Sequence, residues 1–144
     1  MKQVKIDKAS GIIAELIPGI IKGAQVEFLF GQKITQLQFV TLITISYSDQ
    51  CSMSKLAGSM RMSLPQATQI VERLINSGLL KRGDSPADRR LVLVKLTAKG
   101  ESCILNFKQI IRKRWSEVLK SFNEDELDLF IKLTSKLSEE VRRL

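Results

Sequence analysis

The sequence contains no histidine and only two cysteines among its 144 residues. The absence of histidine removes the commonest general base, the commonest zinc ligand and the usual pH-dependent switch. Cys51 and Cys103 follow no metal-ligand spacing. We expect both to be small, partly buried apolar residues of a reduced protein, with a redox or ligand-sensing role as the alternative. No nucleophile and base occur in a recognisable arrangement, so we expect no enzyme, no metal and no cofactor.

Aromatic residues and long apolar runs are also scarce. Aromatic residues make up 6% of the chain and hydrophobic residues 44%, which predicts a mainly aliphatic core. The apolar stretch at residues 11–21 is too short to span a bilayer and contains Glu15 and Pro18. The N-terminus has no signal-peptide layout, and we therefore expect a cytoplasmic protein without membrane association.

Positive charge is what the sequence has in excess. Lys and Arg number 23 against 15 Asp and Glu, which gives a formal net charge of +8. Residues 52–97 carry eight basic and three acidic side chains, and eight minus three leaves +5 of this total in under a third of the chain. Such a concentration favours an anionic partner, nucleic acid above all.

The first part of the chain has the periodicity of helices. Residues 10–30 repeat apolar side chains at three- and four-residue steps, and Pro18 predicts either a kink or a division into a short and a longer helix. Residues 35–47 predict a second helix with Thr35 as N-cap, although their β-branched side chains would also suit a strand.

Two short helices follow in the centre of the chain. Residues 52–60 predict a helix capped by Ser52. Ser63 opens the next helix, with Pro65 in its first turn and Gln66 at the capping-box position. The second of these helices is of a kind that fits the major groove of B-DNA, while the first braces it across the backbone.

A basic hairpin comes after the two helices. Residues 79–82 and 91–96 predict strands, and the segment between them is rich in turn formers and carries Arg89 and Arg90. The tip of such a hairpin reaches an adjacent minor groove, where negative potential attracts arginine. This order of elements predicts a mainly α (α+β) winged helix-turn-helix that binds double-stranded DNA.

Several motifs resemble the MarR family of regulators. Residues 88–97 resemble its wing signature, which runs Asp, any residue, Arg, five residues, Leu-Thr. The motif SKLA at residues 54–57 and SGL at 77–79 are similar to the family's helix-turn-helix, and AKG at 98–100 to the segment after its wing. The chain is thus identified as a member of that family.

The resemblance implies a homodimer. Residues 1–34 and 98–144 would then form helical dimerisation elements, and residues 35–97 the winged DNA-binding region, within one intertwined domain. The alternative is that the apolar ends fold back into an intramolecular bundle. The resemblance also implies a transcriptional regulator, most simply a repressor. As a homodimer it would bind a pseudo-palindromic operator whose half-sites lie about one helical turn apart.

The resemblance also assigns residues to DNA. Gln66 either reads adenine or serves only as a cap, and Arg73 either clamps a phosphate or pairs with Glu72 or Gln69. The second of the two short helices is the recognition helix of the family. The resemblance implies that its positions facing bases or phosphate are Ser63, Leu64, Pro65, Gln66, Thr68, Gln69 and Arg73.

The wing residues have separate roles in this comparison. Arg90 would enter the minor groove, Asp88 would orient it through a salt bridge, and Arg89 would contact phosphate. Ser52 and Lys55 are further candidates for phosphate contacts.

Many members of the family bind small lipophilic or aromatic ligands, so we expect a ligand cleft or, as the alternative, plain core at Ile13, Ile17, Phe39, Ile43 and Phe107. The alternative function is a winged-helix protein-interaction module that does not bind DNA.

Overall fold

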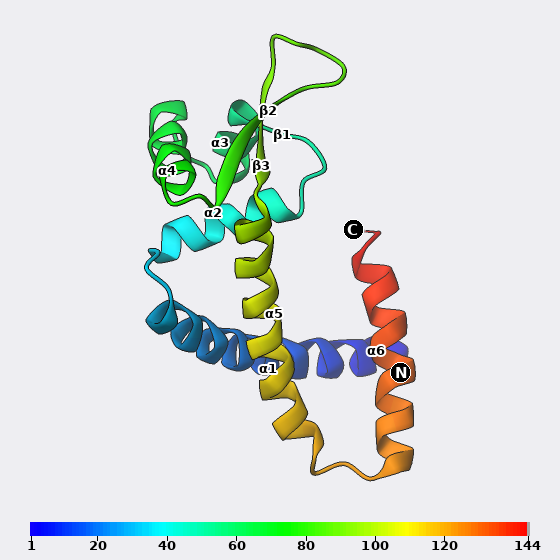
Figure 1. The fold of residues 1–144 in the computed structure, drawn as a ribbon. Coiled ribbons are helices and arrows are strands. Elements are labelled where there is room, and N and C mark those ends of the chain that lie inside the picture. Colours follow the sequence, from blue (N-terminus) through cyan, green and yellow to red (C-terminus); the bar gives the residue numbers. More distant parts are fainter. Residues whose placement is uncertain (144) are drawn as a thin grey trace.

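Six helices and one small antiparallel sheet make up residues 1–143, which are the residues that the computed structural model describes. The sheet and three helices form a head, and α5 descends from it across α1 (Figure 1). The expected fold class, a mainly α winged helix-turn-helix with helical extensions at both ends, is confirmed. None of the helices within residues 1–143 is long and apolar enough to cross a membrane.

Helix α1 spans Lys2–Gly31 without interruption and includes Pro18. The expected division into two helices at Pro18 is therefore wrong, as is the expected start near Ser10. Proline removes one backbone donor, but residues 11–19 are exposed, so solvent can satisfy the carbonyl that loses its partner. Further along, Ala24 and Phe28 are buried and anchor the helix to the head.

Helix α2 spans Gln36–Ser46 and confirms the helix interpretation of a β-branched segment. Thr35 and Gln38 form a capping box at its start. Inside the helix, the Thr41 hydroxyl donates to the Leu37 carbonyl at 2.8 Å, which satisfies a buried polar group without leaving the helix.

Helix α3 spans Met53–Ser59 and helix α4 spans Leu64–Asn76, each with the expected serine cap. Between them Arg61 adopts a positive φ of 51°, the left-handed conformation that turns the chain from one helix to the next.

The sheet contains one strand that the sequence did not predict. Strands β2 (Leu80–Asp84) and β3 (Val92–Leu96) form the expected hairpin, and β1 (Cys51–Ser52) adds to the other side of β3, in the order β1-β3-β2. Cys51 pairs with Val94, which ties the entry to α3 to the base of the hairpin.

Helix α5 spans Ala98–Leu119 and follows β3 directly, with Thr97 as its cap. Helix α6 spans Glu124–Val141 and begins with a capping box made by Asn123 and Glu126. The sequence predicts the first of these helices from Ala98 to about Phe122, capped by Thr97, and the second after an Asn123 cap. Both begin there, and α5 ends three residues earlier than predicted.

Three phenylalanine rings close the core where α1, α2 and α5 meet. Phe28 and Phe39 have ring centroids 4.8 Å apart, and Phe107 lies 5.5 Å from the first and 4.7 Å from the second. Aromatic pairs at these separations and tilts attract one another in addition to burying area. This cluster fixes the head to α1 and α5, which form the helical base below it.

Candidate nucleic-acid interface

Helix α4 has one buried face and one exposed face. Ala67, Ile70, Val71 and Leu74 are buried against the head. The 100° advance per residue places Pro65, Thr68, Gln69 and Glu72 on the opposite side, and all but half-buried Glu72 are exposed. This exposed face of α4 is the one that can enter a groove of DNA.

The first turn of α4 is organised by its capping box. The Ser63 hydroxyl oxygen accepts from the Gln66 backbone N–H at 3.3 Å, and the Gln66 side-chain oxygen accepts from the Ser63 backbone N–H at 3.0 Å. Of the two alternatives for Gln66, the structure thus contains the capping one. Gln69 makes no side-chain hydrogen bond within residues 1–143, so its amide remains available.

Three further residues of α4, Leu64, Pro65 and Thr68, lie beside the cap. The Thr68 hydroxyl donates to the Leu64 carbonyl at 2.8 Å, which leaves its oxygen free to accept. The Leu64 side chain is 49% exposed, an apolar surface at the start of the helix. Pro65 lies in the first turn, as expected.

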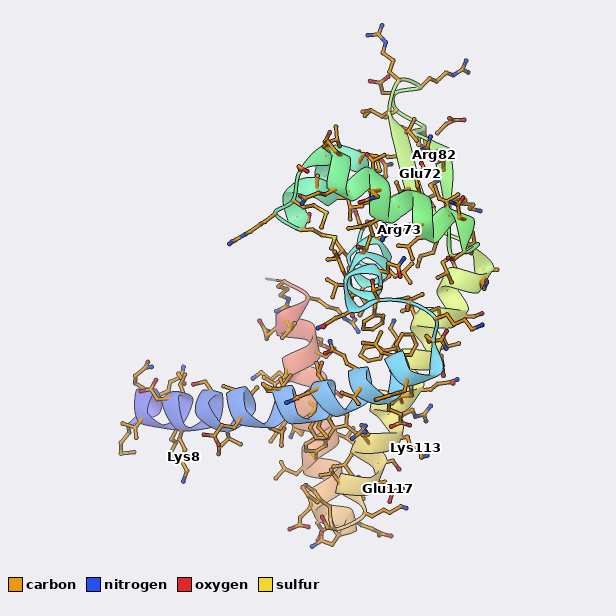
Figure 2. All side chains as sticks on the ribbon, turned by 90° about the vertical axis from the view of Figure 1, so that its left-hand side faces the viewer. Lys8, Glu72, Arg73, Arg82, Lys113 and Glu117 are labelled. Carbon is orange, nitrogen blue, oxygen red and sulfur yellow. The ribbon has the colours of Figure 1, made fainter. Side chains whose placement is uncertain are left out.

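The expected pairing of Arg73 with Glu72 or Gln69 is absent within residues 1–143. Glu72 instead forms an ion pair with Arg82 of β2, and Figure 2 shows the two side chains meeting between the helix and the wing. Arg73 is exposed and keeps its guanidinium for another partner. Sequence reasoning missed Arg82 because the two elements that form the pair are not adjacent in any local pattern.

The wing tip is held by a chain of short-range hydrogen bonds. The Ser85 hydroxyl oxygen accepts from the Asp88 N–H at 3.3 Å, and the Asp88 carboxylate accepts from the Arg90 backbone N–H at 2.9 Å. In residues 1–143 Asp88 therefore orders Arg90 through the main chain, and the side-chain salt bridge that the resemblance implied is not formed. Arg89 and Arg90 are both exposed.

Ser52 and Lys55 meet at the start of α3. The Ser52 hydroxyl oxygen accepts from the Lys55 backbone N–H at 3.2 Å, and the Lys55 ammonium donates to the Gln50 carbonyl at 3.3 Å. Lys55 is exposed, so its charge still faces solvent beside the helix start.

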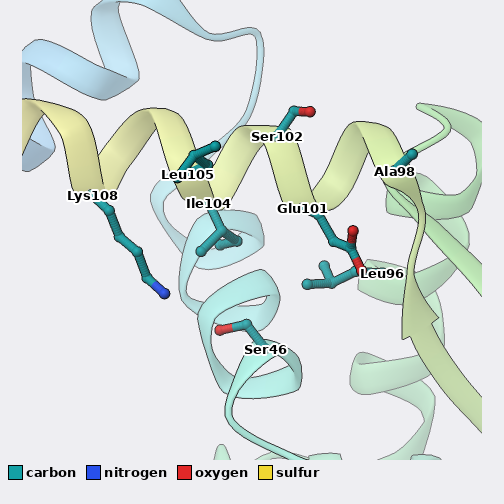
Figure 3. A pocket seen from close by; sticks show the side chains of 8 residues that line it. All are labelled: Ser46, Leu96, Ala98, Glu101, Ser102, Ile104, Leu105 and Lys108. Carbon is teal, nitrogen blue, oxygen red and sulfur yellow. The ribbon is translucent and has the colours of Figure 1, made fainter.

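The five residues considered for a ligand cleft are divided between different environments. Phe39 and Phe107 are buried in the aromatic cluster, and Ile43 is partly buried against the hydrophobic core. Ile13 and Ile17 lie on the exposed half of α1. An open groove of about 570 Å³ lies elsewhere, between the end of α2 and the start of α5, with Ser46, Leu96, Glu101 and Lys108 among its lining residues (Figure 3).

Both cysteines are buried, as expected, and belong to the core. Burial raises the pKa of the Cys51 thiol, against the opposing charge of Lys55. Burial likewise raises the pKa of Cys103, opposed by Lys99. Within residues 1–143, no group of three or more Cys, Asp or Glu side chains is placed to hold a metal ion.

The capped α3–α4 pair followed by a basic hairpin defines a winged helix-turn-helix, the fold of DNA-binding transcriptional regulators. The sequence model of the MarR family matches residues 34–92. A protein of Bacillus subtilis (strain 168), the uncharacterized HTH-type transcriptional regulator YsmB, is 32% identical over 130 residues, which cover 88% of this chain and 87% of that protein. The chain belongs to the MarR family.

Solved structures share the fold over almost the whole chain. The transcriptional regulator Tm0710 from Thermotoga maritima superposes with a TM-score of 0.79 at 22% identity, over 94% of this chain and 96% of that one. A point mutant of MepR from S. aureus, bound to an oligodeoxyribonucleotide, superposes with a TM-score of 0.65 at 18% identity, over 92% and 97% of the two chains.

Proposed function

We propose that this chain is a homodimeric transcriptional repressor that binds a pseudo-palindromic operator. The exposed face of α4 and the basic wing tip lie at the same end of the molecule, and this arrangement carries the proposal (Figure 2). MepR, which has the same fold, has been captured with an oligodeoxyribonucleotide.

The proposed contacts are of two kinds, those that recognise bases in the grooves and those that bind phosphates. Gln69 and Thr68 face base edges in the major groove, while Leu64 and Pro65 offer apolar contact to a thymine methyl. Arg90 enters the adjacent minor groove, ordered by Asp88. Residues that contact phosphate are Ser52, Lys55, Ser63, Arg73 and Arg89, and Gln66 supports this surface by holding the cap.

The exposed apolar residues outside the head support the dimer. Leu129, Leu133, Leu137 and Val141 recur every four residues along α6, and each is about half or more exposed. The α1 half before Pro18 exposes a second apolar set. A lone protein rarely leaves such stripes uncovered, and a second copy of the chain would bury them.

Release by a small lipophilic or aromatic ligand is part of the same proposal. In the single chain, Ile13, Ile17 and Ile43 are the members of the original cleft set that are not fully buried. A ligand that wedges between the helical base and the head would change the spacing of the two heads and weaken operator binding.

Operator affinity measured against salt tests the proposal, with the operator selected from random duplexes. We expect affinity to fall steeply as salt rises, because each phosphate contact releases counterions. Affinity that hardly changes with salt would contradict DNA binding through phosphate and favour a protein-interaction module.

Arg90→Ala tests the wing. We expect operator affinity to fall by about 1–3 kcal/mol per head, since a groove-reading arginine is lost, while the dimer stays intact in sedimentation. Lys33→Ala, which removes one positive charge outside the head, is the control and should leave affinity nearly unchanged. An Arg90→Ala variant that binds the operator as tightly as the wild type would refute the wing assignment.

A further inference from the structure

The exposed face of α4 carries one negative charge, which the phosphates of a bound duplex would repel. Glu72 is the single acidic residue of α4 and lies on the same side as Pro65 and Gln69. A carboxylate near phosphates is repelled by them, so its place on this face calls for another partner.

That partner is Arg82, in the middle of β2. The Arg82 guanidinium donates to the Glu72 carboxylate across ten residues of sequence, with the two side chains 58% and 43% exposed. Of the ion pairs formed within residues 1–143, this is the one inside the head, since the others join α1 to α5 or lie at the C-terminal ends of α5 and α6.

Both ends of the pair stand on rigid elements. Glu72 is in the third turn of α4, beside buried Val71 and Leu74. Arg82 is held in register opposite Val94 at the centre of the sheet. The wing tip extends from this strand, so the pair connects the helix that would enter one groove with the hairpin that would enter the next.

We propose that Glu72 and Arg82 form a positioning pair, which sets the distance between α4 and the wing so that both reach their grooves together. This inference rests on the proposed function. The pair itself contacts no base. It contributes by pre-organising two contacts on one body, which lowers the cost of making the second contact once the first is formed.

The same geometry predicts that the pair acts on specificity. A random duplex can be held by phosphate contacts from either element alone, whereas the operator requires both elements in register. Loss of the pair should therefore weaken operator binding more than binding to random DNA.

A double-mutant cycle tests this. The variants are Glu72→Gln, Arg82→Gln and the double variant, and each is titrated with the selected operator and with a random duplex of equal length at several salt concentrations. We expect each single variant to lower the operator-to-random affinity ratio about fivefold per head, about 25-fold for two heads. The double variant should lose no more than either single one, because the same contact is removed.

Lys81→Gln is the matched control, since it removes the adjacent exposed charge of β2 without touching the pair. This variant should lower the affinity for the operator and for the random duplex alike, and so leave the ratio of the two affinities unchanged. Thermal unfolding of every variant by circular dichroism shows that the head is still folded.

Three outcomes would overturn the positioning role. If Glu72→Gln raises the affinity for both duplexes equally, Glu72 acts only by repelling the phosphates. If Arg82→Gln weakens binding to both duplexes and lowers the salt slope by about 0.9 per head, about 1.8 for two heads, Arg82 is a phosphate contact. Variants that all match the wild type would remove any role for the pair. A wild type that binds neither duplex would instead refute the proposed function itself.

Discussion

Gly100 lies in the first turn of α5, pressed against the chain that leaves α4. A Cβ atom at this position would overlap the Leu79 carbonyl oxygen and come within 3.1 Å of the Leu96 side chain. The Gly100 N–H also donates to the Thr97 cap at 3.1 Å. The close approach of backbone to backbone, rather than any unusual dihedral angle, is what requires glycine here.

Gly100→Ala should therefore destabilise the protein by about 1–3 kcal/mol, since neither main-chain segment can move away freely. Gly58→Ala is the control, because α3 leaves nothing within 4 Å of the added Cβ atom. It should be neutral or stabilising by up to about 1 kcal/mol. Urea unfolding followed by circular dichroism measures both, and equal stability changes would contradict the packing argument.

At the scale of the element, the start of α4 is fixed by the Ser63–Gln66 capping box. Ser63→Ala should lower the free energy of unfolding by about 1 kcal/mol, because an N-terminal amide loses its acceptor. Gln66→Glu should keep the stability, since a carboxylate can accept from the Ser63 N–H as the amide does. Thermal unfolding of both variants checks this, and a Ser63→Ala variant as stable as the wild type would show that the box contributes little.

The helix starts could be predicted because a cap is a local feature. Each cap hydrogen bond joins residues three apart, so a capping residue and the few residues after it are enough to predict the helix start. The predicted caps that the structure contains are Thr35, Ser52, Ser63, Thr97 and Asn123. The continuity of α1 at Pro18 depended instead on exposure there and on burial of Phe28 further along. No window of sequence around the proline contains that information.

The parts of the site that sequence reasoning missed are those joined across elements. Strand β1 has two residues and exists only because β3 pairs with it, and the partner of Glu72 lies on another strand. Asp88 was recognised as a wing residue, but its contact with the Arg90 main chain depends on the turn that Ser85 stabilises. Residue type was predictable here, and the partner was not.

At the scale of the whole molecule, α6 stands apart from the head. It has no buried residue, and its Phe130 lies near Trp115 of α5 and near Phe122 in the segment that connects the two helices. Leu133 is exposed at the middle of the apolar stripe described above. Folding of one chain alone does not account for that stripe.

Leu133→Glu should convert the proposed dimer to monomers, because an unpaired charge would have to be buried at the interface. Operator binding should fall in parallel, since one head alone contacts half a site. Ser135→Glu adds the same charge on the polar side of α6 and should leave the dimer intact. Analytical ultracentrifugation measures the mass, and a Leu133→Glu variant that remains dimeric would exclude the α6 stripe as the interface.

Helix α5 leaves the sheet with only Thr97 between it and β3. Its 22 residues make a rod about 33 Å long. A rod joined without a linker acts as a lever: a tilt of about 10° at the base would carry the head sideways by about 6 Å, roughly a sixth of the 34 Å between successive turns of B-DNA. Small angular changes where the two chains meet would thus be magnified into large errors in half-site spacing.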